Sequence, residues 1–537
     1  MVKEGKILIG KSNGKDIFLY PQMANRHGMV CGATGTGKTV TLKVLAESFS
    51  DLGVPVFFAD VKGDLAGTCL KGTENENVTG RVESMGLAAD GFDYSKYPVN
   101  FWDVYGEKGL PLRTTITEMG PLLLSRIMGL NDLQSDILNI IFQIADKEGL
   151  LLIDTKDLKA MCQYVSENAK EYSEQYGNMA PVSLNAIMRG VSAMESEGAD
   201  LFFGEPALDI SDWMTTDENG KGFIQILDVQ KLILHPRMYS IFLLWLMSEL
   251  FEELPEVGDC EKPKMVFFFD EAHMLFESAN SVLLEKIEQM VKLIRSKGVG
   301  VYFVTQAPSD IPDSVLAQLS NRIENPRDIP DGVLAQLGNK IEHALHAYTP
   351  MEQKAVKAAA MAFRANPEFD TYDTIQELGT GKALVSVLDT EGIPTIVELT
   401  KICPPQSSMG TVEDGERNEV INNSLLFDKY SEAVDRDSAF EFIQRRKLDM
   451  AEKEEKAQAE AEAEKEEMNA TKKLQKELEA KKKAKNTAVK NVAKTTAGTI
   501  GREIGKSVGS IGGKFGKTLG GNIGATLGRN IMGTLFK

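Results

Sequence analysis

The residues Gly32–Thr39, "GATGTGKT", have the types and spacing that suit a loop wrapped around a chain of phosphates. They fit the pattern G-x-x-x-x-G-K-[ST], in which small residues let backbone N–H groups surround phosphate oxygens. The apolar run "GMVCG" leads into the loop and a helical pattern follows it, so a helix N-terminus would add its dipole. The predicted nucleotide site consists of Gly32, Ala33, Thr34, Gly35, Thr36, Gly37, Lys38 and Thr39.

The chemistry of hydrolysis needs a cation, a charged metal ligand and a group that activates water. Lys38 would contact the β- and γ-phosphates, and the Thr39 hydroxyl would bind Mg²⁺. An acidic pair, Asp270 and Glu271, follows the apolar run "KMVFFF". Asp270 suits a role in holding Mg²⁺ through water, and Glu271 can polarise the attacking water. A strand-end acidic pair that only caps the next helix is the alternative.

Two further side chains near the next apolar run could take part. Gln306 ends "VGVYFVTQ", where a glutamine beside the γ-phosphate could sense hydrolysis. Arg295, in "LIRSKG" just upstream, could reach the nucleotide of a neighbouring subunit and stabilise transition-state charge. A solvated basic helix end explains Arg295 equally simply, and the sequence leaves both interpretations open.

The elements that must position these side chains read as alternating strands and helices, which is typical of an α/β fold. The strand candidates are apolar almost throughout, as in a mainly parallel sheet buried on both faces. They are "GMVCG" (28–32), "VPVFFAD" (54–60), "GFIQILDV" (222–229), "KMVFFFD" (264–270) and "GVGVYFVT" (298–305). We expect a helical insertion over about 111–200 and a hairpin over 381–399.

Composition narrows the class of protein. With 537 residues the chain is long enough for two or three domains, and its formal charge of −18 argues against a surface built mainly to neutralise phosphates. The five cysteines are widely spaced and read as reduced thiols. The N-terminus has no secretory pattern, and the most apolar stretch, 239–251, is too short to span a bilayer. We therefore expect a cytoplasmic protein.

The composition changes after about residue 410. We expect a C-terminal extension over 411–450 and, over 451–485, a charged helix of Ala, Glu, Lys and Gln that would extend roughly 50 Å. It lacks a leucine seam, which favours a single helix over a coiled coil. The basic tail, 486–537, carries glycines at four-residue spacing. Either closely packed helices, in an oligomer or at a membrane, or a flexible basic tail would fit this pattern.

One short segment is duplicated. Ala307–Glu324 and Asn325–Glu342 agree at 13 of 18 positions without a gap. A solenoid needs at least three stacked units, so the copy is read as one extra element inserted after the strand that ends in Gln306. Each copy combines a turn, "DIPD", with a short amphipathic helix, "VLAQL". The sequence does not decide which copy packs on the core.

Several motifs together resemble the HerA-like ATPases of the HerA/FtsK clade, over most of 1–445. They are "GATGTGKT", "DVKGDL" (60–65), "GLPLRTTITEMGPLLLSRIMGL" (109–130), "DEAH" (270–273), "IRSKGVGVYFVTQ" (294–306) and "VDRDSAFEF" (434–442). The resemblance implies a RecA-like P-loop core over 1–410, ATP and Mg²⁺ as cofactors, and a homo-oligomeric ring, a hexamer. It also implies ATP-driven translocation on DNA, classically duplex DNA, often alongside a nuclease.

Carried over to this chain, the family's pattern makes Lys38 and Thr39 phosphate-loop residues. It makes Asp270 and Glu271 the metal and water residues, Gln306 the sensor, and Arg295 the finger candidate. Two other functions stay open. One is an ATPase that acts on protein or at a membrane, with the glycine-rich tail as an anchor. The other is a slow regulatory ATP switch whose tail recruits partners.

Overall fold

Thirteen strands form one mixed sheet in the computed structural model, which describes residues 1–258, 260–278, 284, 287, 291, 293–306 and 338–491. The side chains of residues 275, 277, 278, 351 and 483–491 are excepted. The strand order is β1-β2-β13-β12-β11-β4-β10-β9-β5-β8-β6-β7, with β3 paired to β2. The expected α/β fold with a mainly parallel central sheet is confirmed.

All five predicted strands lie in the parallel part of the sheet. They are β4 (Gly28–Cys31), β5 (Val56–Asp60), β8 (Ile224–Asp228), β9 (Met265–Phe269) and β10 (Val299–Thr305). Two further strands, β6 (Val99–Asp103) and β7 (Leu110–Pro111), continue the parallel part of the sheet beyond β8.

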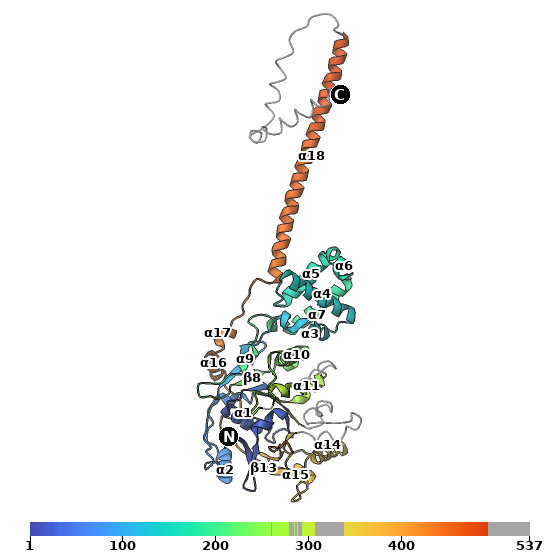
Figure 1. Ribbon diagram of the computed structural model, residues 1–537. Coiled ribbons are helices and arrows are strands. Elements are labelled where there is room, and N and C mark those ends of the chain that lie inside the picture. Colours follow the sequence, from blue (N-terminus) through green and yellow to red (C-terminus); the bar gives the residue numbers. More distant parts are fainter. Residues whose placement is uncertain are drawn as a thin grey trace. The chain divides into compact units, whose positions relative to one another are not determined.

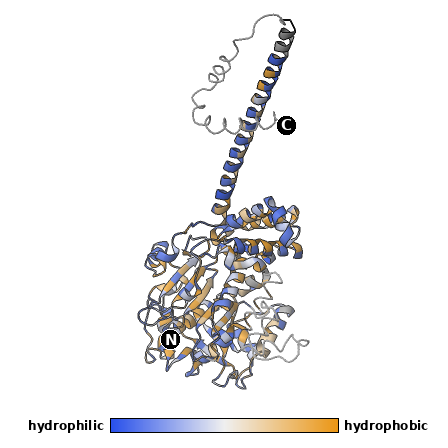
Figure 2. Ribbon diagram, turned by 45° about the horizontal axis from the view of Figure 1, so that its top comes forward, coloured by the Kyte–Doolittle hydropathy of each residue, from blue (hydrophilic) through white to orange (hydrophobic). Residues whose placement is uncertain are grey.

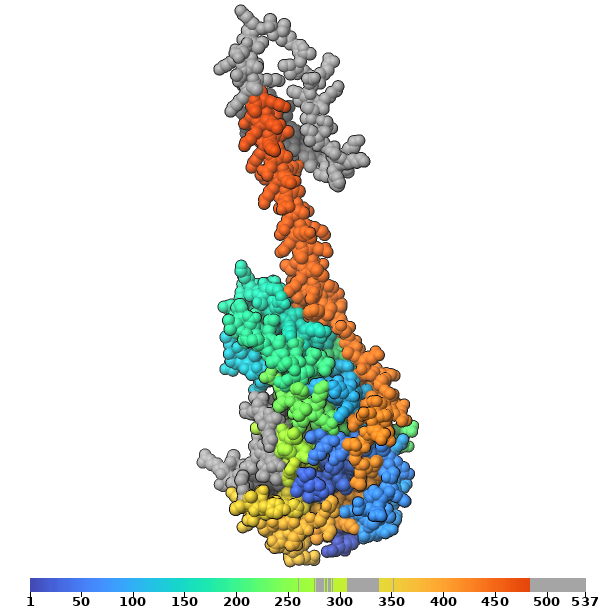
Figure 3. All heavy atoms as spheres, turned by 180° about the vertical axis from the view of Figure 1, so that it is seen from behind, coloured from blue at the N-terminus to red at the C-terminus, as the bar shows by residue number. Residues whose placement is uncertain are grey.

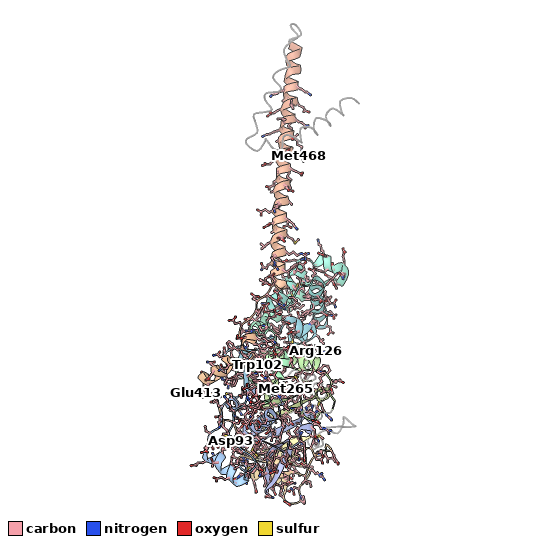
Figure 4. The ribbon with its side chains drawn as sticks, turned by 60° about the vertical axis from the view of Figure 1, so that its left-hand side comes forward. Asp93, Trp102, Arg126, Met265, Glu413 and Met468 are labelled. Carbon is pink, nitrogen blue, oxygen red and sulfur yellow. The ribbon has the colours of Figure 1, made fainter. Side chains whose placement is uncertain are left out.

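Alternating side chains of these strands feed two separate cores, one on each face of the sheet. Phe57, Phe267 and Phe269 belong to one cluster of buried residues, whereas Phe58 and Phe268 belong to the other. This is why the strands are apolar at nearly every position. Trp102 on β6 and Met265 on β9, both labelled in Figure 4, are fully buried.

The other end of the sheet is antiparallel. It contains β1 (Val2–Lys3), β2 (Lys6–Ser12), β3 (Lys15–Leu19), β12 (Lys382–Ser386) and β13 (Glu398–Ile402). The pair β12 and β13 is the hairpin predicted over 381–399. Strands β2 and β3 join through Asn13 and Gly14, whose φ angles of 47° and 83° suit the tight turn that an Asn-Gly pair favours.

Helices cover the sheet, and a helical group interrupts the chain between β7 and β8, as expected for 111–200. This group contains α3 (Ile116–Ile127), α4 (Asp132–Glu148), α5 (Thr155–Glu167), α6 (Ala169–Tyr176), α7 (Pro181–Glu195), α8 (Ala199–Phe202) and α9 (Ile210–Trp213). Figures 1 and 3 show the helices α3–α7 gathered together, in teal. Capping boxes begin α3, α4 and α5.

The remaining helices lie before and after the central strands. They are α1 (Lys38–Asp51), α2 (Glu76–Met85), α10 (Pro236–Glu253), α11 (Ala272–Ser278), α14 (Pro350–Met361), α15 (Thr371–Glu377), α16 (Asp414–Asn422) and α17 (Phe427–Tyr430). Short 3-10 turns are η1 (Pro21–Arg26), η2 (Ala66–Cys69), η3 (Leu232–Leu234) and η4 (Ile294–Lys297).

The duplicated segment contributes one strand to the sheet. Residues 307–337 lie outside the described residues, but the end of the second copy forms β11 (Asn339–Glu342). This strand runs parallel to β4 and antiparallel to β12. All four of its residues are buried. The last residues of the second copy therefore pack on the core.

The chain divides into two compact units, Met1–Lys447 and Leu448–Lys537. One continuous helix, α18 (Ala439–Asn491), begins in the first unit and covers the segment 451–485, for which a charged helix is expected. Its side chains from 448 to 482 are all exposed, and the ribbon of this helix is coloured mostly as hydrophilic in Figure 2. Among the described residues no helix is both long and apolar enough to cross a bilayer. Most of the glycine-rich tail, 492–537, lies outside the described residues.

Candidate active site at the carboxyl edge of the parallel strands

The phosphate-loop candidate, Gly32–Thr39, connects the end of β4 to the start of α1. Gly37 caps α1 with φ of 114°, in a region that favours glycine. A Cβ at Gly32 would lie 2.4 Å from the Cβ of His343, so this position also needs glycine. The Ala33 N–H donates to the Ala344 carbonyl at 2.9 Å, which ties the loop to the segment after β11. The predicted strand–loop–helix arrangement is confirmed.

Lys38 turns back onto its own loop. Its ammonium donates to the carbonyl oxygens of Gly32, at 2.5 Å, and Ala33, at 3.3 Å. The side chain is buried, and burial lowers the pKa of Lys38 while the charge of Glu271 acts in the opposite direction. A bound phosphate would offer this ammonium a charged acceptor in place of neutral carbonyls, which makes the stronger hydrogen bond.

Thr39 contacts an acidic residue from the neighbouring loop. Its hydroxyl donates to Asp64 Oδ2 at 3.1 Å, and the other oxygen of Asp64 is buried with no hydrogen-bond partner among the described residues. Asp60, at the end of β5, is buried close by. Burial, followed by the charge of Asp64, raises the pKa of Asp60 to about 7. The oxygens of Thr39, Asp60 and Asp64 are the hard ligands that Mg²⁺ prefers, so the residues present fit this cation.

The acidic pair predicted to serve hydrolysis lies directly after β9, at the same edge of the sheet. Asp270 and Glu271 are both buried, with 7% and 3% of their surface exposed. Burial, followed by the charge of Glu271, raises the pKa of Asp270 to about 6. A cation bound at this edge would reverse that shift, because it would favour the charged carboxylate.

Both carboxylate oxygens of Glu271 have neighbours. Oε1 accepts a hydrogen bond from the Lys62 ammonium at 2.5 Å, and Oε2 accepts one from the Gln306 amide at 3.3 Å. His273 Nδ1 lies 3.3 Å from Oε2 but makes no hydrogen bond within the described residues. Burial acts to raise the pKa of Glu271, but the hydrogen bond and charge of Lys62 outweigh it, so the net pKa is lowered. Glu271 also has φ of 47°, which is uncommon for a residue other than glycine.

The structure brings most of the predicted site residues together. Gln306 follows β10, and its amide donates to Glu271. Arg295 lies in η4, before β10, where it acts electrostatically on His27 at the start of β4. This is the amino edge of the same strands, so Arg295 lies at the opposite edge from its own chain's phosphate loop.

Three site residues at the end of β5 and in the loop after it were not predicted from the residue pattern. They are Asp60, Lys62 and Asp64, all within "DVKGDL". The Asp60 carboxylate accepts hydrogen bonds from the backbone N–H groups of Lys62, Gly63 and Leu65 and so fixes the loop. The sequence does carry one signal that points to these residues, which is that the polar run directly follows a buried strand. Carboxyl ends of parallel strands meet at one edge, which is the usual place for a site.

The chain was compared with solved structures and with curated proteins. The solved structures to which it is similar include the plasmid coupling protein TrwB in complex with the GTP analogue GDPNP (12% identity, 77% of this chain and 92% of that chain, TM-score 0.48). They also include VirB4 of Thermoanaerobacter pseudethanolicus (18% identity, 75% and 97%, TM-score 0.44). No curated protein matches the chain.

A family model matches nearly the whole chain. It is described as "Helicase HerA-like C-terminal" and aligns with residues 6–324 and again with 323–518. The two matches meet inside the duplicated segment. The resemblance to HerA-like proteins inferred from the motifs is confirmed, and the chain belongs to the HerA-like C-terminal helicase family.

Proposed function

We propose that the protein is a Mg²⁺-dependent ATP hydrolase that uses the carboxyl-edge site to drive a ring-shaped motor. The observation that carries this proposal is the meeting of a phosphate loop and an acidic pair at one edge of the sheet. Lys38 and Thr39 come from the loop after β4, and Asp270 and Glu271 come from the end of β9. This is the residue set that phosphoryl transfer to water requires.

Each side chain has a distinct task in this proposal. Lys38 binds the β- and γ-phosphates, and Thr39 and Asp270 hold the cation, with Asp64 accepting from Thr39. Bound Mg²⁺ would neutralise phosphate charge as the bond to the leaving group breaks. Glu271 accepts a proton from the attacking water. Gln306, which already donates to Glu271, holds the water or senses loss of the γ-phosphate.

We further propose a homo-hexameric ring that translocates on DNA. Family membership supports this proposal, and so does the position of Arg295 at the sheet edge away from its own phosphate loop. In this proposal Arg295 acts on the nucleotide of a neighbouring subunit, as an arginine finger supplied in trans does. A nuclease partner would fit a motor of this class.

The second candidate is an ATPase that acts on protein or at a membrane. The observation that favours it is the long α18, exposed over 448–482 and followed by the glycine-rich basic tail. A charged spacer and a basic tail would suit attachment to anionic lipid. The formal charge of −18 also weakens the case for a surface built around DNA.

The two candidates differ in what stimulates turnover. ATP hydrolysis would be measured with Mg²⁺ alone and with duplex DNA, single-stranded DNA, RNA or anionic liposomes, for the full chain and for a chain ending at residue 485. The DNA motor predicts stimulation by duplex DNA that weakens as salt rises. Equal rates across all nucleic acids, together with stimulation by liposomes that needs the tail, would instead support the second candidate.

A further inference from the structure

Lys62 is a polar residue of the site that has no task in the proposed chemistry. It lies in the loop after β5, and its own backbone N–H donates to Asp60, as do those of Gly63 and Leu65. The backbone of Lys62 is therefore anchored while its side chain extends away from the loop. Its ammonium reaches across to the end of β9, where it donates to Glu271 Oε1 at 2.5 Å.

The two partners differ in their surroundings. The side chain of Lys62 is 45% exposed, whereas that of Glu271 is 3% exposed. Glu271 is confined by its burial and by the Gln306 amide on its other oxygen, while Lys62 has solvent on one side. Any rearrangement that separates the pair will therefore move Lys62 more easily than Glu271.

This ion pair restrains Glu271 as a general base. Lys62 donates to Oε1 and Gln306 donates to Oε2, so each oxygen already accepts one hydrogen bond, and the ammonium stabilises the charged carboxylate against taking a proton. The arrangement suits a resting enzyme, because a carboxylate held by an ammonium activates water less well before the nucleotide arrives.

A bound γ-phosphate would compete for the same ammonium. Lys38, the phosphate-loop lysine, interacts electrostatically with both Glu271 and Lys62, which places all three charges in one neighbourhood. The γ-phosphate carries more negative charge than one carboxylate and lies where Lys38 directs it. It can draw the more exposed Lys62 away from Glu271, whereas ADP, which lacks this group, cannot.

We propose that Lys62 is a positioning residue that restrains Glu271 when no ATP is bound and transfers to the γ-phosphate when ATP binds. The proposal rests on the proposed ATP site and assigns to it a way of detecting the third phosphate. Exchange of one ion pair for another releases Oε1 toward the attacking water. It also makes hydrolysis-competent geometry depend on ATP rather than ADP.

The test measures affinity, so it does not depend on turnover. A fluorescent non-hydrolysable ATP analogue and fluorescent ADP, each with Mg²⁺, would be titrated into full-length wild type, Lys62→Met and Lys62→Arg. Lys62→Met should weaken binding of the ATP analogue about tenfold and leave ADP affinity within about twofold, because only the γ-phosphate contact is lost. Lys62→Arg should restore most of the difference.

A matched control is available elsewhere in the molecule. Lys429 is 46% exposed and pairs with Asp212 at 2.6 Å, so Lys429→Met removes a similar ion pair from α17. This control should bind both nucleotides like wild type. If Lys62→Met binds both nucleotides like wild type, or loses affinity equally for both, the role assigned to Lys62 is overturned.

A double-mutant cycle tests the exchange itself. Glu271→Gln removes the charge that competes for Lys62, so affinity for the ATP analogue should rise while ADP affinity stays constant. Adding Lys62→Met should abolish that rise, and a rise that persists would contradict the exchange. If the wild type hydrolyses no ATP, the proposed function fails, but these affinities still report on Lys62. If it does hydrolyse ATP and the affinities fail, only the role of Lys62 is lost.

Discussion

The Thr39 hydroxyl donates a hydrogen bond to Asp64 Oδ2 at 3.1 Å, which joins the phosphate loop to the loop after β5. The second oxygen of Asp64 is buried without a hydrogen-bond partner among the described residues. A buried carboxylate oxygen in that state is costly unless a cation or water serves it. This oxygen would suit contact with a water bound to Mg²⁺, a feature that the phosphate-loop pattern alone does not specify.

Asp64→Asn should weaken the affinity of the site for Mg²⁺ without destroying the fold. The amide keeps the shape of the side chain but loses the charge that would attract the cation and orient its water. We expect Mg²⁺-dependent binding of fluorescent ADP to need about tenfold more Mg²⁺, while binding without metal is unchanged. The exposed Glu218→Gln is a control of similar chemistry remote from the site. An unchanged Mg²⁺ dependence would show that Asp64 only orders the loop.

The location of Arg295 predicts activity shared between subunits. Arg295→Ala and Lys38→Ala should each abolish turnover alone, because one lacks the finger and the other the phosphate contact. Rings mixed from the two variants would contain interfaces where an intact Arg295 faces an intact phosphate loop, and these should recover part of the activity. Mixed assembly would be verified by differential tags. Absence of recovery in verified mixed rings would count against action in trans.

The duplicated segment predicts that one copy can replace the other. Deletion of 325–342 joins the first copy's "NRIE" to His343, in place of the "NKIE" that forms β11. The Asn339 amide, which donates to the carbonyls of Met23 and His27, has an identical counterpart in Asn321. The two copies differ at Lys340, which donates to the Ala362 carbonyl. After the deletion an arginine would take this position, which should lower the free energy of unfolding by ~1 kcal/mol.

Circular dichroism and ATPase assays on three deletions would check this. Removal of 307–324 or of 325–342 should each leave a folded, active protein, whereas removal of 307–342 should not fold, because no segment fills the position of β11. An unfolded 325–342 deletion would show that the first copy cannot serve as a strand.

Glu249 on α10 predicts a stability change with pH. Burial, followed by the charge of Glu118, raises the pKa of Glu249 from 4.5 to about 7. Because the folded-state pKa lies above the unfolded value, ionisation costs the folded state, and stability falls as pH rises from about 4.5 through 7. Glu249→Gln should therefore be more stable than wild type at pH 8, by ~1 kcal/mol after allowance for its partial exposure, and nearly equal at pH 4.5. Thermal unfolding at both pH values would measure this, and an equal difference at both would contradict it.

An element can be predicted from the sequence when its own residues determine its burial, and cannot when its burial depends on hydrogen-bond partners far away in the chain. The five central strands were predictable because "VFFAD" and "MVFFF" are apolar on both faces, which suits only a buried parallel sheet. Strand β11 was not, because Asn339, Lys340 and Glu342 are polar and buried. Their burial depends on acceptors supplied by residues far away in the chain, such as Met23 and Ala362.

The site residues divide in the same way, into those with a local sequence pattern and those that depend on distant contacts. Lys38, Thr39, Asp270 and Glu271 could be found because phosphate loops and strand-end acidic pairs have local patterns. Lys62 and Asp64 have no such pattern, since their roles depend on contacts with residues 209 and 25 positions away. The β2–β3 hairpin did carry a local signal, because the Asn13-Gly14 pair lies between two apolar runs and such a pair favours a tight hairpin turn.

The most direct test of the account is Mg²⁺-dependent ATP hydrolysis by the full chain, compared with Lys38→Ala and Glu271→Gln. The account predicts hydrolysis by wild type and by the control Lys429→Met. It predicts loss of nucleotide binding in Lys38→Ala, and retained binding with turnover reduced roughly 100-fold or more in Glu271→Gln. Unimpaired turnover in both variants would contradict the assignment of the carboxyl-edge site.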